Sequence, residues 1–494
     1  MSNRPETNKQ SCPVYKKCGG CQLQNLSYPE QLEFKQRKVE KLLKRFCTVE
    51  KIIGMKTPYH YRNKVQAAFY TDKKGKIISG VYQSGSHHVV GIDSCQTEDV
   101  IADKIIVAVR KLLPSFRMTT YNEDTGKGFL RHILVKRGFA TNQIMLVLVT
   151  GTPVFPSKNN FVKAILKQFP EITTIVQNIN PYRTNLVLGD NQKVLYGKGY
   201  IEDILCGCRF RISPKSFYQI NPVQTEVLYG KAIEFANLKG NETVLDTYCG
   251  IGTIGIIAAK NGAGNVIGAE LNGDAVRDAI VNARANNLKN IRFYKADAGE
   301  FMREAADEDE KPDIVFMDPP RAGSDRKFLD SLIKMSPKKV VYVSCNPETL
   351  ARDLAYLTQN SPYKAQKIQP VDMFPHTAHI ETVVLLSHKK PDGHINVKVE
   401  FGEGEGKVPL DNIAKRVESY KPKERVTYKM IKEYIEAKYG FKVHTAYIAE
   451  VKRDLGLPMY DAPNAAEGLK QTRKHPTQEK VNAIKDALNY YNLI

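Results

Sequence analysis

The sequence predicts an α/β protein built around a mainly parallel sheet with helices on both faces. Between residues 211 and 388, short and almost wholly apolar strands alternate with helix-length stretches, a pattern typical of parallel sheets buried on both faces. Residues 60–150 and 172–212 hold further short strands rich in Val and Ile, which predict a basic, mixed α+β lobe before this sheet. Residues 395–494 contain amphipathic helices and predict a small, mostly helical extension.

The chain of 494 residues is too long for one ordinary domain. We divide it into a basic, cysteine-bearing segment (1–100), the β-rich centre of the same lobe (101–210), the α/β domain (211–388) and the extension (389–494). In the first segment, Leu32, Val39, Leu42 and Leu43 recur near helical spacing and predict a helix over residues 28–46.

The end of the α/β domain and the extension carry weaker signals. The last apolar strand, residues 381–387, closely follows a His- and Glu-rich segment, so we expect it to be an antiparallel edge. Residues 389–391 (KKP) have the composition of a linker. Beyond them, residues 426–440 and 446–456 are predicted to form two helices. Their spacing is loosely that of a helix-turn-helix, although a plain helical appendage is the simpler interpretation.

The composition favours some classes of partner and excludes others. The net charge is +20, and residues 1–150 alone carry 25 basic against 12 acidic side chains, which favours a nucleic-acid partner over a generally basic background. No stretch approaches the roughly 18 apolar residues of a membrane helix, so we expect no membrane partner. The first residues lack the apolar core of a secretory signal. Nine cysteines then predict metal binding or thiol chemistry in a reducing, cytoplasmic compartment.

The segment VLDTYCGIGTIGI is the strongest signal for a ligand. A strand ends at an acidic residue, and a loop with glycines at 250, 252 and 255 leads into a helix, so the backbone can approach a ligand closely. Taken alone, these glycines fit a dinucleotide. S-adenosylmethionine is favoured because acidic residues end three successive strands and line the crevice where open α/β sheets bind ligands. They are Asp246, Glu270, placed for ribose hydroxyls, and Asp297, near the expected adenine.

Two further strand ends indicate the reaction. DIVFMDPPRAG places Asp318 and two prolines at one strand end, and a loop of this kind is typical of methyltransferases that act on amino groups of bases. VVYVSCNPETL places Cys345 at another strand end, at the same edge of the sheet. A cysteine packed in the core would be the ordinary interpretation. Its position at a strand terminus instead favours a thiolate nucleophile.

The segment DMFPHTAHIE supplies a candidate base. His379 and Glu381 alternate and point the same way if the segment is extended, and either group can take a proton. Carbon 5 of uracil needs a thiolate, a base and a methyl donor together: the thiolate adds to carbon 6 and makes carbon 5 nucleophilic, and a base later removes the carbon-5 proton. Methylation of an amino or hydroxyl group needs no such cysteine.

Taken together, SFYQINPVQTEVL, DTYCGIGTIG, DPPRAG, YVSCNPETLARD and DMFPHTAHIE resemble the class I RNA (uracil-5-)-methyltransferase family over about residues 10–388. The resemblance implies a Rossmann-like catalytic domain in which Cys345 is the nucleophile and Glu381 the base. It further implies that the methyl donor contacts Gln219, Tyr248, Thr253, Glu270, Asp297 and Asp318. Phe217 and Gln219 would border the target base.

The resemblance also gives a role to four cysteines. Cys12, Cys18, Cys21 and the distant Cys95 suit zinc as well as iron and sulfur. They resemble the branch of the family with a [4Fe–4S] cluster, which implies a mainly structural cluster that ties a helix start to a distant loop. Core packing is expected for most of the remaining cysteines, Cys47, Cys206, Cys208 and Cys249.

Basic residues of the N-terminal lobe resemble family segments that face RNA. They are Arg62, Lys64, Arg131 and His132, expected to contact phosphates so that affinity falls steeply with salt. Many relatives carry a small β-barrel RNA-binding domain that is not found before these cysteines, so we expect RNA selection to involve the extension.

The sequence therefore predicts a monomeric, S-adenosylmethionine-dependent enzyme that methylates carbon 5 of a uridine in structured RNA. We expect 23S ribosomal RNA, with transfer RNA as the alternative. Two other hypotheses remain open, namely methylation of an amino group, based on the DPP loop, and a non-catalytic RNA-folding factor.

Overall fold

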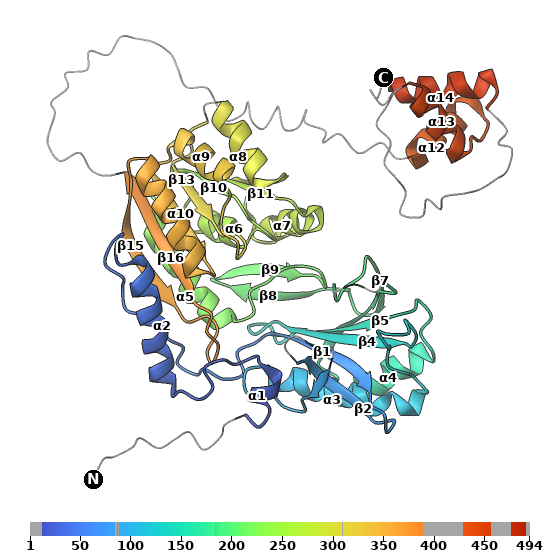
Figure 1. Ribbon diagram of the computed structural model, residues 1–494, viewed down its shortest axis with the longest axis horizontal. Helices are drawn as coiled ribbons and strands as arrows, with labels where there is room; N and C mark the ends of the chain where they lie inside the picture. Colours follow the sequence, from blue (N-terminus) through green and yellow to red (C-terminus); the bar gives the residue numbers. More distant parts are fainter. Residues whose placement is uncertain are drawn as a thin grey trace. The chain divides into compact units, whose positions relative to one another are not determined.

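The computed structural model describes residues 12–83, 86, 88–182, 184, 186–308, 310–388, 428–455 and 476–490. The chain divides into two units, Met1–Gly393 and His394–Ile494, each with its own hydrophobic core (Figure 1). The expected linker at residues 389–391 lies outside the described residues.

The α/β domain of the first unit contains a seven-stranded sheet in the order β12-β11-β10-β13-β14-β16-β15. Its strands are β10 (Thr243–Asp246), β11 (Asn265–Glu270), β12 (Ile291–Lys295), β13 (Ile314–Met317), β14 (Lys339–Ser344), β15 (Tyr363–Val371) and β16 (Glu381–His388). Its helices are α5 (Pro222–Ala236), α6 (Thr253–Lys260), α7 (Gly273–Ala285), α8 (Ala298–Asp307), α9 (Arg326–Met335) and α10 (Pro347–Asn360). The predicted α/β class is confirmed.

The antiparallel part of this sheet differs from the expectation in one respect. Strands β10 to β14 pair in parallel, and β16 pairs antiparallel with β14, as predicted. However, β16 is not the edge, because β15 pairs with its other side. The sequence of β15, YKAQKIQPV, mixes charged and apolar residues, and this pattern of a half-exposed edge strand hid it from the sequence analysis.

The N-terminal lobe is built on a second seven-stranded sheet, in the order β3-β2-β1-β4-β5-β6-β7. These strands are β1 (Lys64–Thr71), β2 (Ile77–Tyr82), β3 (Val89–Gly91), β4 (Leu130–Arg137), β5 (Ile144–Thr150), β6 (Ile172–Ile179) and β7 (Asn191–Tyr196). Helices α3 (Val100–Leu112) and α4 (Lys158–Gln168), which the sequence analysis did not identify, share one core with residues of this sheet. Short helices α1 (Tyr15–Cys18) and η1 (Pro114–Phe116) complete the lobe.

The two sheets share a core across a small hairpin. Strands β8 (Ile201–Leu205) and β9 (Cys208–Ile212) pair with each other and lie between the sheets (Figure 1). Met145 and Val147 of β5, Phe210 of β9 and Val244 of β10 belong to one buried cluster. The lobe and the α/β domain are therefore packed together rather than connected by a free linker.

Helix α2 (Tyr28–Leu43) lies within the predicted range 28–46. It begins with a capping box in which Ser27 and Glu30 hydrogen bond reciprocally. Its buried face is Gln31, Lys35, Val39 and Leu43, a stripe with spacing i, i+4. The two polar members of this stripe replace the expected apolar ones, since Leu32 and Leu42 are only partly buried.

The second unit is a helical module. Two predicted helices are present as α12 (Tyr428–Tyr439) and α13 (Thr445–Asp454), and α14 (Gln478–Tyr490) is an additional one. Ile431, Ile435, Ile448, Ile484 and Leu488 form the centre of its core.

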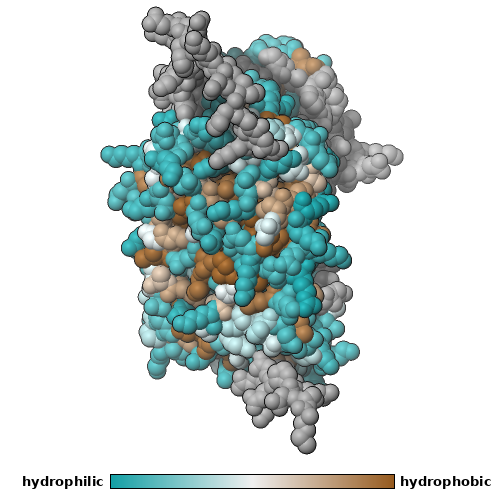
Figure 2. Space-filling model, turned by 90° about the vertical axis from the view of Figure 1, so that its left-hand side faces the viewer, coloured by the Kyte–Doolittle hydropathy of each residue, from teal (hydrophilic) through white to brown (hydrophobic). Residues whose placement is uncertain are grey.

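The surface agrees with the charged composition. The side of the first unit that carries α2 is mostly hydrophilic, with apolar residues gathered near its middle (Figure 2). Among the described residues, no helix has the length and apolar character needed to cross a bilayer.

Candidate active site

The carboxyl ends of β10, β11, β13 and β14 meet at one edge of the sheet, where the chain forms a pocket of about 460 Å³. The described lining includes nine candidate residues singled out from the sequence and several others. The candidates are Phe217, Gln219, Tyr248, Thr253, Glu270, Asp318, Cys345, His379 and Glu381, and the others include Tyr229, Arg321 and Phe374. The topology thus gathers residues from six separate segments of the chain, near positions 217–229, 248–254, 270, 318–321, 345 and 374–381, into one cavity.

The glycine-rich turn after β10 forms one wall. Gly252 has φ +83°, and a Cβ atom there would lie 2.7 Å from Cζ of Phe293, so only glycine fits. The Glu270 carboxylate accepts a hydrogen bond from the N–H of Gly250 at 3.1 Å, which ties the end of β11 to this turn. Asp246 accepts from the N–H of Gly255 at 2.8 Å, and burial raises its pKa to about 7.

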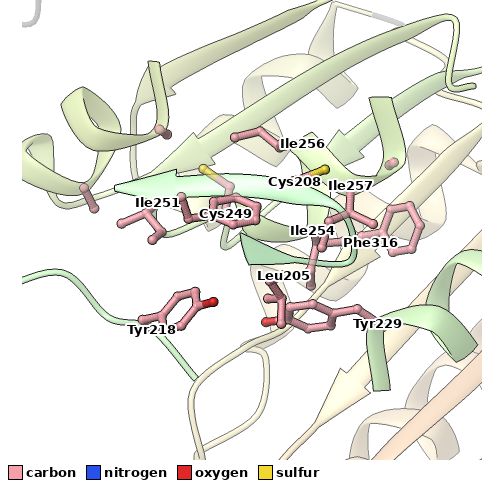
Figure 3. Close-up of a cluster of buried hydrophobic side chains, with 14 of the residues drawn as sticks. Leu205, Cys208, Tyr218, Tyr229, Cys249, Ile251, Ile254, Ile256, Ile257 and Phe316 are labelled. Carbon is pink, nitrogen blue, oxygen red and sulfur yellow. The ribbon is translucent and has the colours of Figure 1, made fainter. Parts of the chain in front are cut away.

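Tyr229 of α5 is a pocket residue that the sequence analysis missed. Its hydroxyl is hydrogen bonded to the side chains of Thr253 and Gln219, and the Asp318 charge acts on it. Figure 3 shows its ring in the same buried cluster as Cys249 and Ile254 of the glycine-rich turn. Tyr229 looks like an ordinary apolar position of a helix, and no motif distinguishes it. Its link to Thr253 and Gln219 fixes two of the predicted methyl-donor contacts relative to each other.

Three acidic groups act on one another deep in the pocket. Glu381, the first residue of β16, is buried, and burial together with the charge of Asp318 raises its pKa well above the ordinary value. Burial raises the pKa of Asp318 to about 7. The pKa of the Cys345 thiol rises to about 11 through burial, then through Glu381 and Asp318, while the Arg321 guanidinium opposes the increase. Because a nearby positive charge would favour the ionised forms of these buried acidic groups, the site suits a cationic ligand.

The mouth of the pocket carries an exposed aromatic ring. Phe217 is 66% exposed although it lines the pocket, whereas its neighbour Tyr218 is buried and donates a hydrogen bond to Asp203 at 3.3 Å. An exposed ring at a pocket mouth is suited to stacking on a planar ligand. His379 also lines the pocket, in edge contact with Phe374 at 6.0 Å between ring centroids.

The segment that carries Phe217 and Gln219 is held by the N-terminal lobe. Asn63 donates a side-chain hydrogen bond to the carbonyl of Gln219 at 3.0 Å. Lys136 of β4 donates to the carbonyls of Ser213 and Ser216 at 2.9 and 2.8 Å. Burial lowers the pKa of Lys136 to about 7. The lobe therefore shapes one side of the pocket.

Two predicted methyl-donor contacts have other partners in the structure. Asp297 is exposed, does not line the pocket, and caps α8 by accepting from the N–H groups of Gly299 and Glu300. Its predicted contact with adenine stays a prediction. Tyr248 lines the pocket, and its hydroxyl lies 3.5 Å from that of Ser324.

Of the four cysteines expected to hold a cluster, three act electrostatically on the fourth, Cys21. Among the described residues, no group of three or more His, Cys, Asp or Glu has the arrangement of a metal centre. The thiols nevertheless act on one another electrostatically: burial and then Cys95, with smaller effects from Cys18 and Cys12, raise the pKa of Cys21 to about 12. The described residues therefore do not show a formed cluster site.

Arg62 lies beside these thiols. It is largely buried, its guanidinium interacts with Cys21 and Glu98, and its Nε lacks a hydrogen-bond partner among the described atoms. Burial and the charge of Arg62 lower the pKa of neighbouring Lys64. A cation here is suited to offset negative charge on the four thiolates of a bound cluster.

The expectation that Arg131 and His132 grip phosphates is corrected. The Arg131 side chain is 1% exposed, pairs with Glu123 at 2.9 Å and donates to the carbonyls of Asn180 and Tyr182 at 2.7 Å. His132 is buried, and burial lowers its pKa to about 4. Both side chains lie inside the lobe because β4 is central in its sheet. They stabilise the lobe and do not face solvent.

Comparison with known proteins agrees with the site. Residues 182–389 match the model of the tRNA (uracil-5-)-methyltransferase family. An RNA methyltransferase of Bacillus cereus is 44% identical over 388 residues, which cover 78% of this chain and 84% of that protein. One from Listeria monocytogenes is 46% identical over 379 residues, covering 76% and 83%.

A solved structure extends the likeness to the fold. The crystal structure of the Pyrococcus abyssi tRNA (uracil-54, C5)-methyltransferase, in complex with S-adenosyl-L-homocysteine, is similar with a TM-score of 0.63 and 30% identity. The match covers 76% of this chain and 87% of that one. Together with the pocket, in which a cysteine and two carboxylates, Asp318 and Glu381, meet at the strand ends, these relatives show that the chain belongs to the class I, S-adenosylmethionine-dependent RNA (uracil-5-)-methyltransferase family.

Proposed function

We propose that this enzyme methylates carbon 5 of a uridine through covalent catalysis, with Cys345 as the nucleophile and Glu381 as the base. The observation that supports this most directly is the presence of both side chains in one pocket, close enough for the Glu381 charge to raise the pKa of the Cys345 thiol. If the thiol and the carboxylate lay at separate sites, the charge of Glu381 would not affect the pKa of Cys345.

The proposed reaction proceeds in balanced steps. The Cys345 sulfur adds to carbon 6, and carbon 5 becomes nucleophilic and takes the methyl group, which leaves S-adenosylhomocysteine. Glu381 then removes the carbon-5 proton, the carbon 5–carbon 6 double bond re-forms, and the thiolate is expelled. The raised pKa of Glu381 makes it a stronger base than an exposed carboxylate.

The remaining pocket residues support binding. Gln219, Tyr248, Glu270 and Asp318 border the expected position of the methyl donor, and their negative potential suits a sulfonium cation. Phe217 is exposed at the mouth and is suited to stack on a uracil that has left its own base stack.

For the substrate, we propose 23S ribosomal RNA. The net charge of +20 supports a large polyanionic partner. Transfer RNA is the second candidate, favoured by the likeness to the Pyrococcus abyssi enzyme, whose substrate is uracil 54 of tRNA. Disrupting the gene and mapping lost 5-methyluridine over all cellular RNA distinguishes the two.

The covalent step is tested with two variants. Cys345→Ala should abolish both turnover and any enzyme–RNA complex that survives denaturation, because no thiolate can add to carbon 6. Glu381→Gln should accumulate that complex, since methyl transfer precedes the proton removal that it blocks. Denaturing gels of enzyme incubated with cellular RNA and S-adenosylmethionine measure the complex.

Cys47→Ala serves as the control, because Cys47 lies outside the pocket and its loss should leave turnover unchanged. Full activity of Cys345→Ser would instead favour the amino-group reaction suggested by the DPP loop. Intact RNA binding without methyl transfer to any RNA would favour the non-catalytic hypothesis.

We further propose that Cys12, Cys18, Cys21 and Cys95 hold a [4Fe–4S] cluster with a mainly structural role. The electrostatic effect of the other three thiols on Cys21 and the partly buried Arg62 that interacts with Cys21 support it. Purified protein should absorb near ~400 nm and contain iron, and Cys95→Ser should lose both. A colourless protein with bound zinc would exclude the cluster.

A further inference from the structure

The segment between β15 and β16, residues 372–380, lines part of the pocket and directly precedes Glu381 in the chain. Phe374 and His379 line the pocket, and Glu381 follows at once as the first residue of β16. Sheet pairing holds both ends of this segment, because Val371 pairs with Glu381. We call residues 372–380 the wall hairpin.

Residues 22–35 make hydrogen bonds to the wall hairpin. The Leu23 N–H donates to the carbonyl of His376 at 2.9 Å, and the Ala378 N–H donates to the side chain of Gln22 at 3.2 Å. These contacts follow directly after Cys21 in the chain. We call residues 22–35 the clasp.

Gln31 makes the most specific contacts of the clasp. Its Oε1 accepts from the His376 N–H at 2.8 Å, and its Nε2 donates to Nδ1 of the same histidine at 3.2 Å. The other ring nitrogen of His376 lies 2.9 Å from the carbonyl oxygen of Pro58. Because a carbonyl only accepts, Nε2 carries the proton and Nδ1 is free to accept from Gln31.

The backbone of His376 needs this support. Its φ is +68°, a left-handed conformation that residues other than glycine rarely adopt, and its side chain is buried. Tyr59 packs against the ring at 4.9 Å between centroids. The turn at His376 is therefore maintained by its contacts and not by its own preference.

Lys35 completes the clasp at the other end of the wall hairpin. Its ammonium donates to Asp372 at 2.6 Å in a buried environment, and to the partly buried carbonyl of Phe374 at 3.0 Å. The clasp thus holds the wall hairpin near its start through Lys35, at its turn through Gln31, and near its end through Gln22.

We propose that the clasp positions Glu381 for proton removal, with Gln31 as a positioning residue that acts through His376. The inference rests on the proposed role of Glu381 as the base. Cys345 belongs to the end of β14 and makes no contact with the clasp that the structure records, so adduct formation is separable from proton removal. Loosening the clasp should therefore slow release more than addition.

The test compares single-turnover rates of adduct formation and release. In Gln31→Leu, release should slow about tenfold, since a displacement of less than 1 Å already weakens a proton transfer, and adduct should accumulate. Gln31→Glu should restore release only in part, because a carboxylate keeps the acceptor for the His376 N–H but loses the donor to Nδ1. Gln22→Ala removes one contact at an exposed residue, leaves folding intact, and should slow release to a smaller extent.

Gln36→Leu is the matched control. Gln36 lies on the same helix and also bonds to backbone outside it, at Glu50 and Ile52, without touching the wall hairpin. Release as fast in Gln31→Leu and Gln22→Ala as in Gln36→Leu would overturn the inference. Glu381→Gln is measured in parallel. If it accumulates adduct while Gln31→Leu and Gln22→Ala release product normally, Glu381 remains the proposed base and only the role of the clasp is rejected. If Glu381→Gln releases product normally, the proposed base is wrong and the inference falls with it.

Discussion

The ionisable side chains of the pocket include Asp318, Arg321, Cys345 and Glu381. Their charges affect the pKa of the Cys345 thiol and of Glu381. Asp318, Cys345 and Glu381 are acidic groups withdrawn from water; Asp318 makes ionisation of Glu381 harder, and both carboxylates make ionisation of Cys345 harder. Arg321 is the nearby cation that opposes this effect on the thiol and on Glu381. The free enzyme therefore holds Cys345 mainly as a thiol, and a cationic methyl donor would shift the balance toward the thiolate.

Removing the negative charge of Asp318 and removing the positive charge of Arg321 should change the reactivity of Cys345 in opposite directions. Removing the Asp318 charge in Asp318→Asn should lower the thiol pKa from about 11, and removing the Arg321 charge in Arg321→Gln should raise it. Because only the thiolate reacts, alkylation by iodoacetamide at pH 8.5 should be faster in the first variant and slower in the second. Mass spectrometry of the peptide with Cys345 measures both rates.

Cys345→Ala gives the background from the other cysteines in that experiment. Equal alkylation rates for both variants and the natural protein would show that burial alone determines the thiol pKa.

Among the elements, α2 shows how a helix can be amphipathic and still bury polar groups. Its buried stripe includes Gln31 and Lys35, and both contact the wall hairpin, more than three hundred residues away in the sequence. Lys35 and Asp372 form a fully buried ion pair, with both side chains 0% exposed. Tyr28 also donates to Asp372, at 2.9 Å.

Breaking this pair should cost far more stability than an exposed one. Lys35→Met leaves the Asp372 carboxylate buried without its cation, so the free energy of unfolding should fall by about 3–5 kcal/mol. In the double variant Lys35→Met/Asp372→Asn, part of the loss should return, because the uncompensated charge is gone. Chemical denaturation followed by circular dichroism measures all three proteins.

Arg37→Met is the matched control on the same helix. Arg37 pairs with Glu33, and these side chains are 72% and 60% exposed, so its loss should leave stability almost unchanged. A similar loss in Arg37→Met and Lys35→Met would contradict a special role for the buried pair.

At the scale of the whole molecule, the pocket belongs to one unit while the chain has two. Residues that line the pocket come from the first unit, where the lobe and the α/β domain share one core. The second unit has a separate core around Ile435 and Ile484. Cofactor binding and any contribution of the second unit to RNA selection are therefore separable.

A chain that ends at Gly393 should keep the methyl-donor site. S-adenosylhomocysteine should raise its Tm as much as that of the full chain, because no lining residue is lost. If the extension takes part in RNA selection, as expected from the sequence, the shortened chain should bind its RNA more weakly and methylate other uridines. Loss of the thermal shift would show instead that the second unit supports the pocket.

The sequence alone determined the α/β class and most of the pocket. Apolar strands of a parallel sheet place their carboxyl ends at one edge, so Glu270, Asp318 and Cys345 could be brought together by topology without knowing any contact. Glu381 followed from a motif and from its place at the start of a strand. Such local signals are readable because they depend on near neighbours in the chain.

Only the tertiary structure decided the contacts between distant segments. Tyr229 enters the pocket, Arg131 is buried rather than exposed, and Lys35 pairs with Asp372 across 337 positions of sequence. A tyrosine, an arginine or a lysine has the same pattern in a sequence whether its partner is water or a buried group. Burial depends on how distant segments pack together. It decides which of these polar side chains bind a buried partner and which face solvent.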